Sequence, residues 1–146
     1  MCNTACYNTW YYQWIALMKH IKIKKFSNEA KKVNLKDEIL VETLNHFMKL
    51  DRDEQQKYSL GSGLYKLRIA TKEGRGKSGG SRIILAFKRD DSIYWLHLFS
   101  KNDKGNVTTS ELKKLKNLAD ILFELTDEQI VKLINLGELC EVVINV

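Results

Sequence analysis

The stretch that decides the fold runs from Gly61 to Asn106 and reads GSGLYKLRIATKEGRGKSGGSRIILAFKRDDSIYWLHLFSKNDKGN. It contains ten Lys or Arg residues and four Asp or Glu residues, an excess of six positive charges. The whole protein of 146 residues has a formal net charge of +6, so the rest of the chain is neutral overall. A cationic segment on a neutral scaffold indicates a polyanionic partner, and nucleic acid is the first candidate.

Three runs within this stretch have the patterns of β-strands. The run 64–70 alternates apolar residues with Lys66 and Arg68, so both cations face the same side of a strand. The run 82–88 also alternates apolar residues, with a cation at each end. The run 93–101 is apolar on both faces, which indicates a central or doubly covered strand without showing which face meets the core.

The connections between these runs predict an antiparallel meander. Residues 88–92 (KRDDS) form a short polar hairpin turn, and residues 71–80 contain four of the eight glycines. Glycine lets the backbone adopt positive φ and lets a bulky ligand approach closely. The meander would place four cations near one another as a candidate site: Lys66, Arg68, Arg82 and Lys101.

Length and composition favour one globular domain with a sizeable core, because 44% of the residues are hydrophobic and 29% are charged. The pI near 9.2 agrees with an anionic partner. Cys2, Cys6 and Cys140 are an odd number and do not suggest a disulfide framework. The spacing Cys2-x₃-Cys6 lacks a second ligand pair, so we expect no zinc site and a reducing, cytoplasmic location.

Residues 1–17 are rich in aromatic side chains and uncharged. They have neither the basic start nor the small-residue cleavage site of a signal peptide, and their apolar part is too short to span a bilayer. Met18 is followed at once by KHIKIKK. We therefore expect an N-terminal extension at 1–17 and a domain at 18–146; the alternative is an additional packed helix.

Helix and strand signals continue before the meander. Residues 20–26 alternate apolar and basic positions as a short strand does. Ser27 then has the chemistry of a helix cap, with Phe26 as the preceding apolar staple. Residues 36–50 predict an amphipathic helix whose apolar stripe contains Leu40, Leu44 and Phe47. Residues 51–62 are polar and are interpreted as a loop, whereas His46 is interpreted as a surface residue of the helix.

Two capping boxes predict helices after the meander. Thr108 with Glu111 opens the first, and Thr126 with Gln129 opens the second, which Gly137 ends. Residues 139–146 follow as a short edge strand. The order β-α-α-β-β-β-α-α predicts an α+β domain, with a mostly antiparallel sheet of about four strands packed against helices.

The chemistry of the residues points to catalysis by cations. Gly76-Lys77-Ser78 is not a phosphate-binding Walker loop, because Thr71 stands where that loop needs glycine and a strand pattern follows. His97 in its apolar strand is interpreted as a core or edge residue. A cluster of cations can act without histidine, because neighbouring positive charges lower a lysine's pKa and arginine can hold a phosphate with two hydrogen bonds. The alternative is a solvated strand face.

Residues 65–106, with YKLRIA, GRGKSGGSRII and LFSKNDKGNV, resemble the RelE/ParE superfamily of type II toxins. The combined GxGKSGG, SRII and FSKND signals are closest to the RelE-type HigB branch. The likeness extends roughly from Met18 to Val142 and includes the tail GELCEV. It implies a small cytoplasmic α+β domain that cleaves mRNA on the ribosome and is silenced by an antitoxin, which is expected to carry a helix-turn-helix and to be encoded by the adjacent gene.

The resemblance further implies an endoribonuclease that uses the RNA 2′-OH as nucleophile and needs no metal or cofactor. Carried over motif by motif, Lys66 is the base, Arg82 clamps the phosphate, Arg68 is an electrostatic partner and Lys101 is a leaving-group acid or substrate contact. Three further cations are expected to bind RNA: Arg75, Lys77 and Lys104.

One position departs from the branch. The residue before Arg82 is commonly aromatic there, but here it is Ser81, so a base-stacking ring is missing. Tyr65, Tyr94 and Trp95 are candidate substitutes, although each also fits a core position.

Two alternative functions remain from the sequence. The first is a gyrase poison, because ParE relatives share the fold and act on gyrase without being nucleases. The second is a non-catalytic RNA-binding module or a toxin that has lost its activity. The retained Lys and Arg positions favour the nuclease, with ribosome and mRNA as partners and no membrane.

Overall fold

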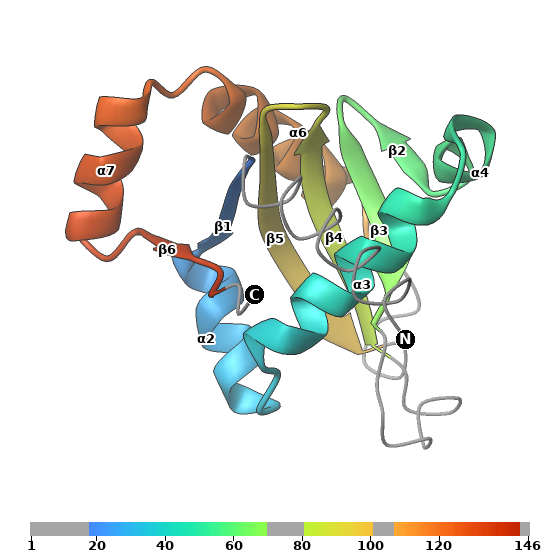
Figure 1. Ribbon diagram of the computed structural model, residues 1–146, viewed down its shortest axis with the longest axis horizontal. Coiled ribbons are helices and arrows are strands. Elements are labelled where there is room, and N and C mark those ends of the chain that lie inside the picture. Colours follow the sequence, from blue (N-terminus) through green and yellow to red (C-terminus); the bar gives the residue numbers. More distant parts are fainter. Residues whose placement is uncertain (1–17, 70–80, 101–106, 144–146) are drawn as a thin grey trace, which may run out of the picture.

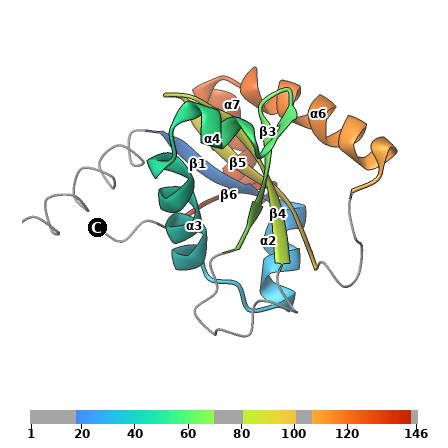
Figure 2. The same ribbon diagram turned by 90° about the vertical axis from the view of Figure 1, so that its right-hand side faces the viewer.

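The computed structural model describes residues 18–69, 81–100 and 107–143. Within these ranges, five helices and six strands form one α+β domain. The elements are β1 (Lys19–Ile23), α2 (Lys24–Lys32), α3 (Asp37–Lys49), α4 (Arg52–Gln56), β2 (Ser59–Gly61), β3 (Leu64–Arg68), β4 (Ser81–Lys88), β5 (Ser92–Ser100), α6 (Thr109–Phe123), α7 (Asp127–Asn135) and β6 (Leu139–Glu141). Figures 1 and 2 show the sheet between α3 on one face and α6 on the other. The predicted extension at 1–17 lies outside the described residues.

The strands form a single sheet in the order β2-β3-β4-β5-β1-β6. Its neighbouring strands are antiparallel except for β1 and β5, which are parallel. The predicted α+β class and the meander of β3, β4 and β5 are therefore confirmed. The expectation of about four strands was too low, because the short strands β2 and β6 extend the sheet at its two edges.

One face of the sheet is covered by α2 and α3. The predicted stripe of α3 is confirmed, since Leu40, Leu44 and Phe47 are at most 2% exposed. These side chains join a cluster that includes Ile83 and Trp95 from the sheet. Burying each large apolar side chain contributes about 1.5–3 kcal/mol relative to exposure, so this stripe holds α3 on the sheet.

The opposite face is covered by α6 and α7, which contribute Ala119, Leu122 and Ile130 to a second cluster. Both predicted capping boxes are present, with Thr108 and Thr126 as the capping residues. Each box pairs backbone N–H groups that the first helical turn leaves without a partner. The second helix stops as expected, because Gly137 has φ of +80°.

The chain between β1 and α3 differs from the expectation. The strand ends at Ile23 and α2 begins at Lys24, so Ser27 lies inside the helix instead of capping it. Phe26 and Ala30, one turn apart, are both buried. Phe26 packs against Trp95 with ring centroids 6.0 Å apart. This tertiary contact favours a helix at residues 24–26, where the alternation of apolar and basic residues had predicted a strand.

Residues 51–62 also differ, since they form α4 and β2 instead of a loop. The Asp51 side chain accepts a hydrogen bond from the Glu54 N–H at 2.9 Å and caps α4. Gln55 is buried and donates to the Phe47 carbonyl at 3.0 Å. The buried residue of α4 is thus polar and is satisfied by the backbone, so the segment shows no apolar periodicity. The sequence pattern therefore did not predict this helix.

A β-bulge interrupts the pairing of β4 with β5. Leu85 pairs with Trp95, but Ile84 pairs with His97, so one extra residue stands in β5. Trp95 therefore belongs to the α3-side cluster, whereas Phe99 belongs to the α6-side cluster. Trp95 and Phe99, four residues apart, thus lie on opposite faces of the sheet, because a bulge reverses the alternation that follows it.

Candidate functional site

The register of β3 and β4 brings three of the predicted cations together. Arg68 stands directly opposite Arg82, and Lys66 lies two residues before Arg68 on the same face. The Ile69 N–H donates to the Ser81 carbonyl at 3.2 Å, which marks the neighbouring pair as hydrogen-bonded. The two arginines thus form a non-hydrogen-bonded pair, the position where opposed side chains lie closest.

This pairing is electrostatically unfavourable without a bound anion. Like charges directly opposite each other on a sheet are destabilising. Arg68 is exposed, whereas Arg82 is only partly exposed. The Nη1 atom of Arg82 is buried and has no hydrogen-bond partner among the described residues. A buried donor left unpaired costs about 1–3 kcal/mol, so an acceptor that reached Nη1 would remove this cost.

Two cross-strand rows define this end of the sheet. Arg68, Arg82 and Phe99 form one row, and Lys66, Ile84 and His97 form the other. The rings of His97 and Phe99 stack with centroids 5.3 Å apart and an interplanar angle of 21°. The apolar surface that Phe99 and Ile84 contribute beside the cations lowers the local dielectric and strengthens their field.

His97 is 7% exposed, which confirms its interpretation as a core or edge residue. Sequence reasoning nevertheless missed that the bulge places it on the same face as Lys66, two strands away. Glu29 of α2 reaches the adjoining open edge of β5, where its Oε2 lies 3.5 Å from His97 Nδ1 and its Oε1 accepts from the Leu98 N–H at 3.3 Å. Bulges often redirect a side chain next to a functional site. An all-apolar run carries no signal of a bulge.

The other predicted site residues lie outside the described ranges. Lys101 and Lys104 belong to 101–106, and Arg75 and Lys77 belong to 70–80. In the sequence these segments follow β3 and β5, whose last residues lie at the end of the sheet that carries the arginine pair.

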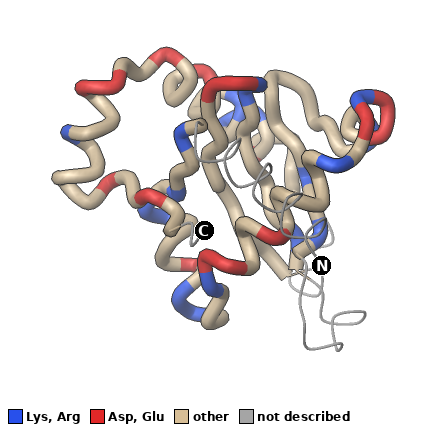
Figure 3. Tube along the Cα trace, viewed as in Figure 1, with Lys and Arg blue, Asp and Glu red and all other residues tan. Residues whose placement is uncertain are grey.

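Two cations of the central stretch lie at the opposite end of β4 from Arg82. Lys88 is exposed, and Arg89 donates to the Gln55 side chain at 2.9 Å and lies over the Phe87 ring at 5.5 Å. Figure 3 shows basic residues spread along the tube, with acidic and basic residues adjacent at the β4–β5 turn. The excess charge of the central stretch therefore does not form one continuous patch among the described residues.

The proposed substitutes for the missing aromatic ring are placed unfavourably. Tyr94 and Trp95 are at most 1% exposed, so they are core residues. Tyr65 is partly buried and packs edge-on against Phe47 and Phe87, with centroids 5.0 and 6.1 Å away. None of these three rings presents a free face at the arginine pair.

The described residues contain no group of three or more His, Cys, Asp or Glu side chains placed to bind a metal ion. Across those residues, no helix combines the length and apolar character needed to cross a membrane.

The fold and the site define a small α+β domain of the RelE/ParE type, with a cationic end of the sheet suited to an anion. A family model described as "RelE toxin of RelE / RelB toxin-antitoxin system" matches residues 18–142. The chain belongs to this family of toxins, and membership implies an antitoxin partner.

Proposed function

We propose that this toxin is a ribosome-dependent mRNA endoribonuclease that inhibits translation until a cognate antitoxin binds it. The observation that carries the proposal is the opposed pair of Arg68 and Arg82, with the Nη1 atom of Arg82 buried and without a partner in the described chain. Such a pair suits the two non-bridging oxygens of a phosphodiester. Family membership supports it, because RelE toxins are generally endoribonucleases.

The proposed reaction is an internal transesterification. Lys66 removes the proton from a ribose 2′-OH, and the 2′-oxygen attacks the adjacent phosphorus. The bond from phosphorus to the 5′-oxygen breaks, and Lys101 donates a proton to that oxygen. The products are a 2′,3′-cyclic phosphate and a 5′-hydroxyl end. Arg82, supported by Arg68, stabilises the negative charge that develops on the phosphate.

Dependence on the ribosome follows from what the proposed site recognises. Contacts to phosphate fix the strand but carry no sequence information. A nucleophile must nevertheless be aligned with its phosphorus, and such alignment contributes about 7–11 kcal/mol to lowering a barrier. We infer that the ribosome supplies this alignment by holding the mRNA, while Arg75, Lys77 and Lys104 bind its backbone.

Induced expression followed by mapping of mRNA 5′ ends on translating ribosomes tests the proposal. The parent protein is expected to produce new ends within codons, and Arg82→Met is expected to produce none. Lys88→Met changes a cation at the far end of the same strand and is the matched control, expected to cleave like the parent. Breaks in gyrase-bound DNA without mRNA cleavage would instead identify a ParE-like activity and overturn the proposal.

Two finer assignments accompany the proposal. The HigB-type branch is inferred from the GxGKSGG, SRII and FSKND motifs, and the cytoplasmic location follows from a ribosomal target.

A further inference from the structure

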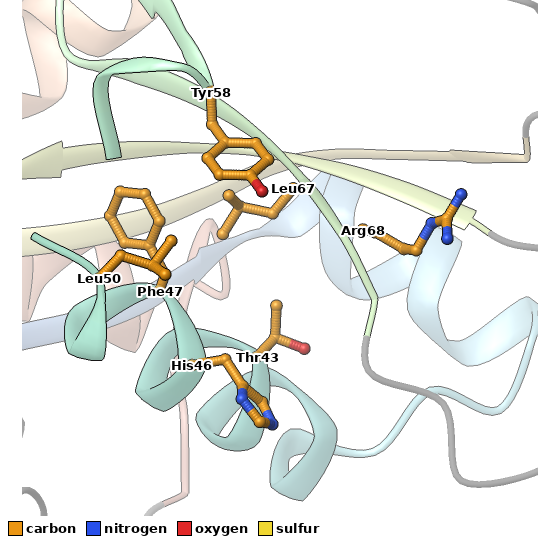
Figure 4. A pocket seen from close by; sticks show the side chains of 7 residues that line it. All are labelled: Thr43, His46, Phe47, Leu50, Tyr58, Leu67 and Arg68. Carbon is orange, nitrogen blue, oxygen red and sulfur yellow. The ribbon is translucent and has the colours of Figure 1, made fainter. Parts of the chain in front are cut away.

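A cavity of about 270 Å³ lies between α3 and β3, at the edge of the sheet (Figure 4). Its apolar lining comes from Phe47, Leu50 and Leu67. Cavities that bind drug-sized ligands measure about 300–1,000 Å³. The volume here suits one flat heterocycle better than a larger ligand.

Tyr58 supplies an aromatic ring to this cavity. It is 44% exposed, and it is the one aromatic residue among the exposed large hydrophobic residues of the described chain. Figure 4 shows its phenol ring beside Leu67, on the side of the cavity opposite α3. Its backbone is fixed on both sides, because its N–H donates to the Gln55 carbonyl at 3.0 Å and its carbonyl accepts from the Lys66 N–H at 2.9 Å. The backbone that carries the ring is therefore ordered before any ligand arrives, which lowers the entropic cost of binding.

His46 supplies a polar group on the α3 side. It is exposed and lines the cavity together with Thr43 from the preceding turn of the same helix. Imidazole offers both a hydrogen-bond donor and an acceptor when neutral. A planar ligand between Tyr58 and α3 could stack on the ring and form hydrogen bonds along its edge.

Arg68 joins this cavity to the arginine pair. It lines the cavity, yet Figure 4 shows its guanidinium pointing away from the other lining side chains. Because the Ile69 N–H bonds to β4, the N–H and C=O of Arg68 point to the opposite side, the edge of β3 that β2 does not cover. Leu67 faces the cavity on the α3 side of the sheet, whereas the Arg68 side chain points to the α6 side with Arg82 and Phe99. An RNA strand that reaches both sites would therefore cross this open edge of β3 at Arg68.

We propose that this cavity binds one nucleobase of a single-stranded RNA whose phosphate lies at Arg68 and Arg82, with Tyr58 as the stacking platform. The proposal rests on the proposed function and adds a specificity subsite to it. Single-stranded RNA is recognised mainly by bases stacked on aromatic side chains. Tyr58 would thus provide the ring that Ser81 lacks. An extended peptide could also pair with the open edge of β3, but a cavity of this size lined by an exposed aromatic ring and an imidazole favours a flat base.

A binding experiment with the full chain tests this subsite directly. The probe is a short single-stranded oligoribonucleotide whose 2′-hydroxyls are methylated, so that it cannot be cleaved through them. Stacking on an aromatic residue contributes about 1–3 kcal/mol per base, which corresponds to about 5- to 150-fold in affinity. Tyr58→Leu should weaken binding by that factor, whereas Tyr58→Phe keeps the ring and should bind like the parent.

Abasic oligonucleotides locate the base. At one position, removing the base should abolish the difference between the parent and Tyr58→Leu, as a double-mutant cycle requires for two groups in contact. His46→Ala is a second variant at an exposed position and should weaken binding by about 2- to 12-fold through one lost hydrogen bond. Thermal melts establish that each variant is folded.

The outcomes separate this proposal from the proposed function. Coupling of Tyr58 to one base without any ribosomal cleavage would support the subsite and overturn the nuclease. Cleavage by the parent without coupling at any abasic position would overturn the subsite and leave the nuclease standing. Loss of antitoxin binding by Tyr58→Leu with unchanged RNA binding would identify a peptide site and also overturn the proposal.

Discussion

Arg82→Met should make the folded protein more stable and the toxin inactive. Methionine keeps an unbranched stem of similar length but removes both the charge and the buried Nη1 atom, which has no partner among the described residues. Relief of an unpaired buried donor contributes about 1–3 kcal/mol. Relief of the repulsion from Arg68 adds at most about 1 kcal/mol, because that side chain is exposed and a Cβ spacing of about 5 Å gives little Coulomb energy in water.

Thermal and urea unfolding measure the first effect. For a domain of this size, 1 kcal/mol corresponds to roughly 4 °C in Tm. We therefore expect Arg82→Met to melt several degrees above the parent. Single-turnover cleavage on ribosomes measures the second effect, and a lost preorganised donor lowers the rate by about 10²–10³. A substitution that raises stability while removing activity is the signature of a functional site that strains the fold.

Lys88→Met provides the control on the same strand. Lys88 is exposed at the other end of β4, so its loss should change stability by less than about 0.5 kcal/mol and leave cleavage unchanged. If Arg82→Met is less stable than the parent, the guanidinium is a structural group and does not strain the fold. If Arg82→Met cleaves at the parent rate, Arg82 is not part of the catalytic site.

Four further predictions follow from other contacts. Ile83→Asp should unfold the domain by burying a charge at a position that is 0% exposed, as circular dichroism would show, and a folded variant would contradict the core assignment. Burial lowers the pKa of His20 from 6.5 to about 4, and its Nε2 accepts from Trp95 Nε1–H at 2.7 Å. The unfolded chain therefore binds a proton that the folded chain does not between these values, so stability should be full above pH 6.5 and fall by about 3 kcal/mol towards pH 4, a loss that His20→Gln should reduce in urea titrations. Asp37→Ala should lower the free energy of unfolding by about 2 kcal/mol in urea titrations, because the Asp37 carboxylate accepts from Lys22 Nζ at 2.6 Å and from the Val143 N–H at 2.9 Å. Unchanged stability would show those contacts to be weak. If about four phosphates are contacted, log K for RNA should fall with log salt at a slope near −3, and Lys77→Ala should flatten that slope by somewhat under one unit; an affinity independent of salt would contradict the electrostatic interpretation.

The sequence predicted those parts of the fold that depend on local pattern. The alternation around Lys66 and Arg68 located β3, and the two threonine capping boxes located α6 and α7. It could not predict where a tertiary contact overrides the pattern. Phe26 forms helix because Trp95, far along the chain, packs against it. Gln55 in α4 is held by the Phe47 carbonyl and by the Arg89 side chain, both distant from it in sequence.

The site was predictable to the same extent. Parity placed Lys66 and Arg68 on one face, and the short turn of the β4–β5 hairpin fixed the meander. The position of His97 required the bulge, which leaves no trace in a run of apolar residues. Tyr58 could not be recognised either, because a tyrosine in a polar segment reveals nothing about the cavity that a distant helix completes.

The strand order has a consequence for how the molecule folds. The meander of β3, β4 and β5 joins strands that are neighbours in sequence, so only short lengths of chain have to close for these strands to pair. By contrast, β1 must pair with β5 more than seventy residues later and with β6 about 120 residues later, as Lys19 with Ser92 and Ile21 with Glu141 show. Long-range pairing costs loop-closure entropy before the paired strands stabilise the chain, and this slows folding. Lys66, Arg68 and Arg82 can thus come together in a partly folded chain. Pairing of β1 with β5 and β6 then limits the rate at which the complete toxin forms.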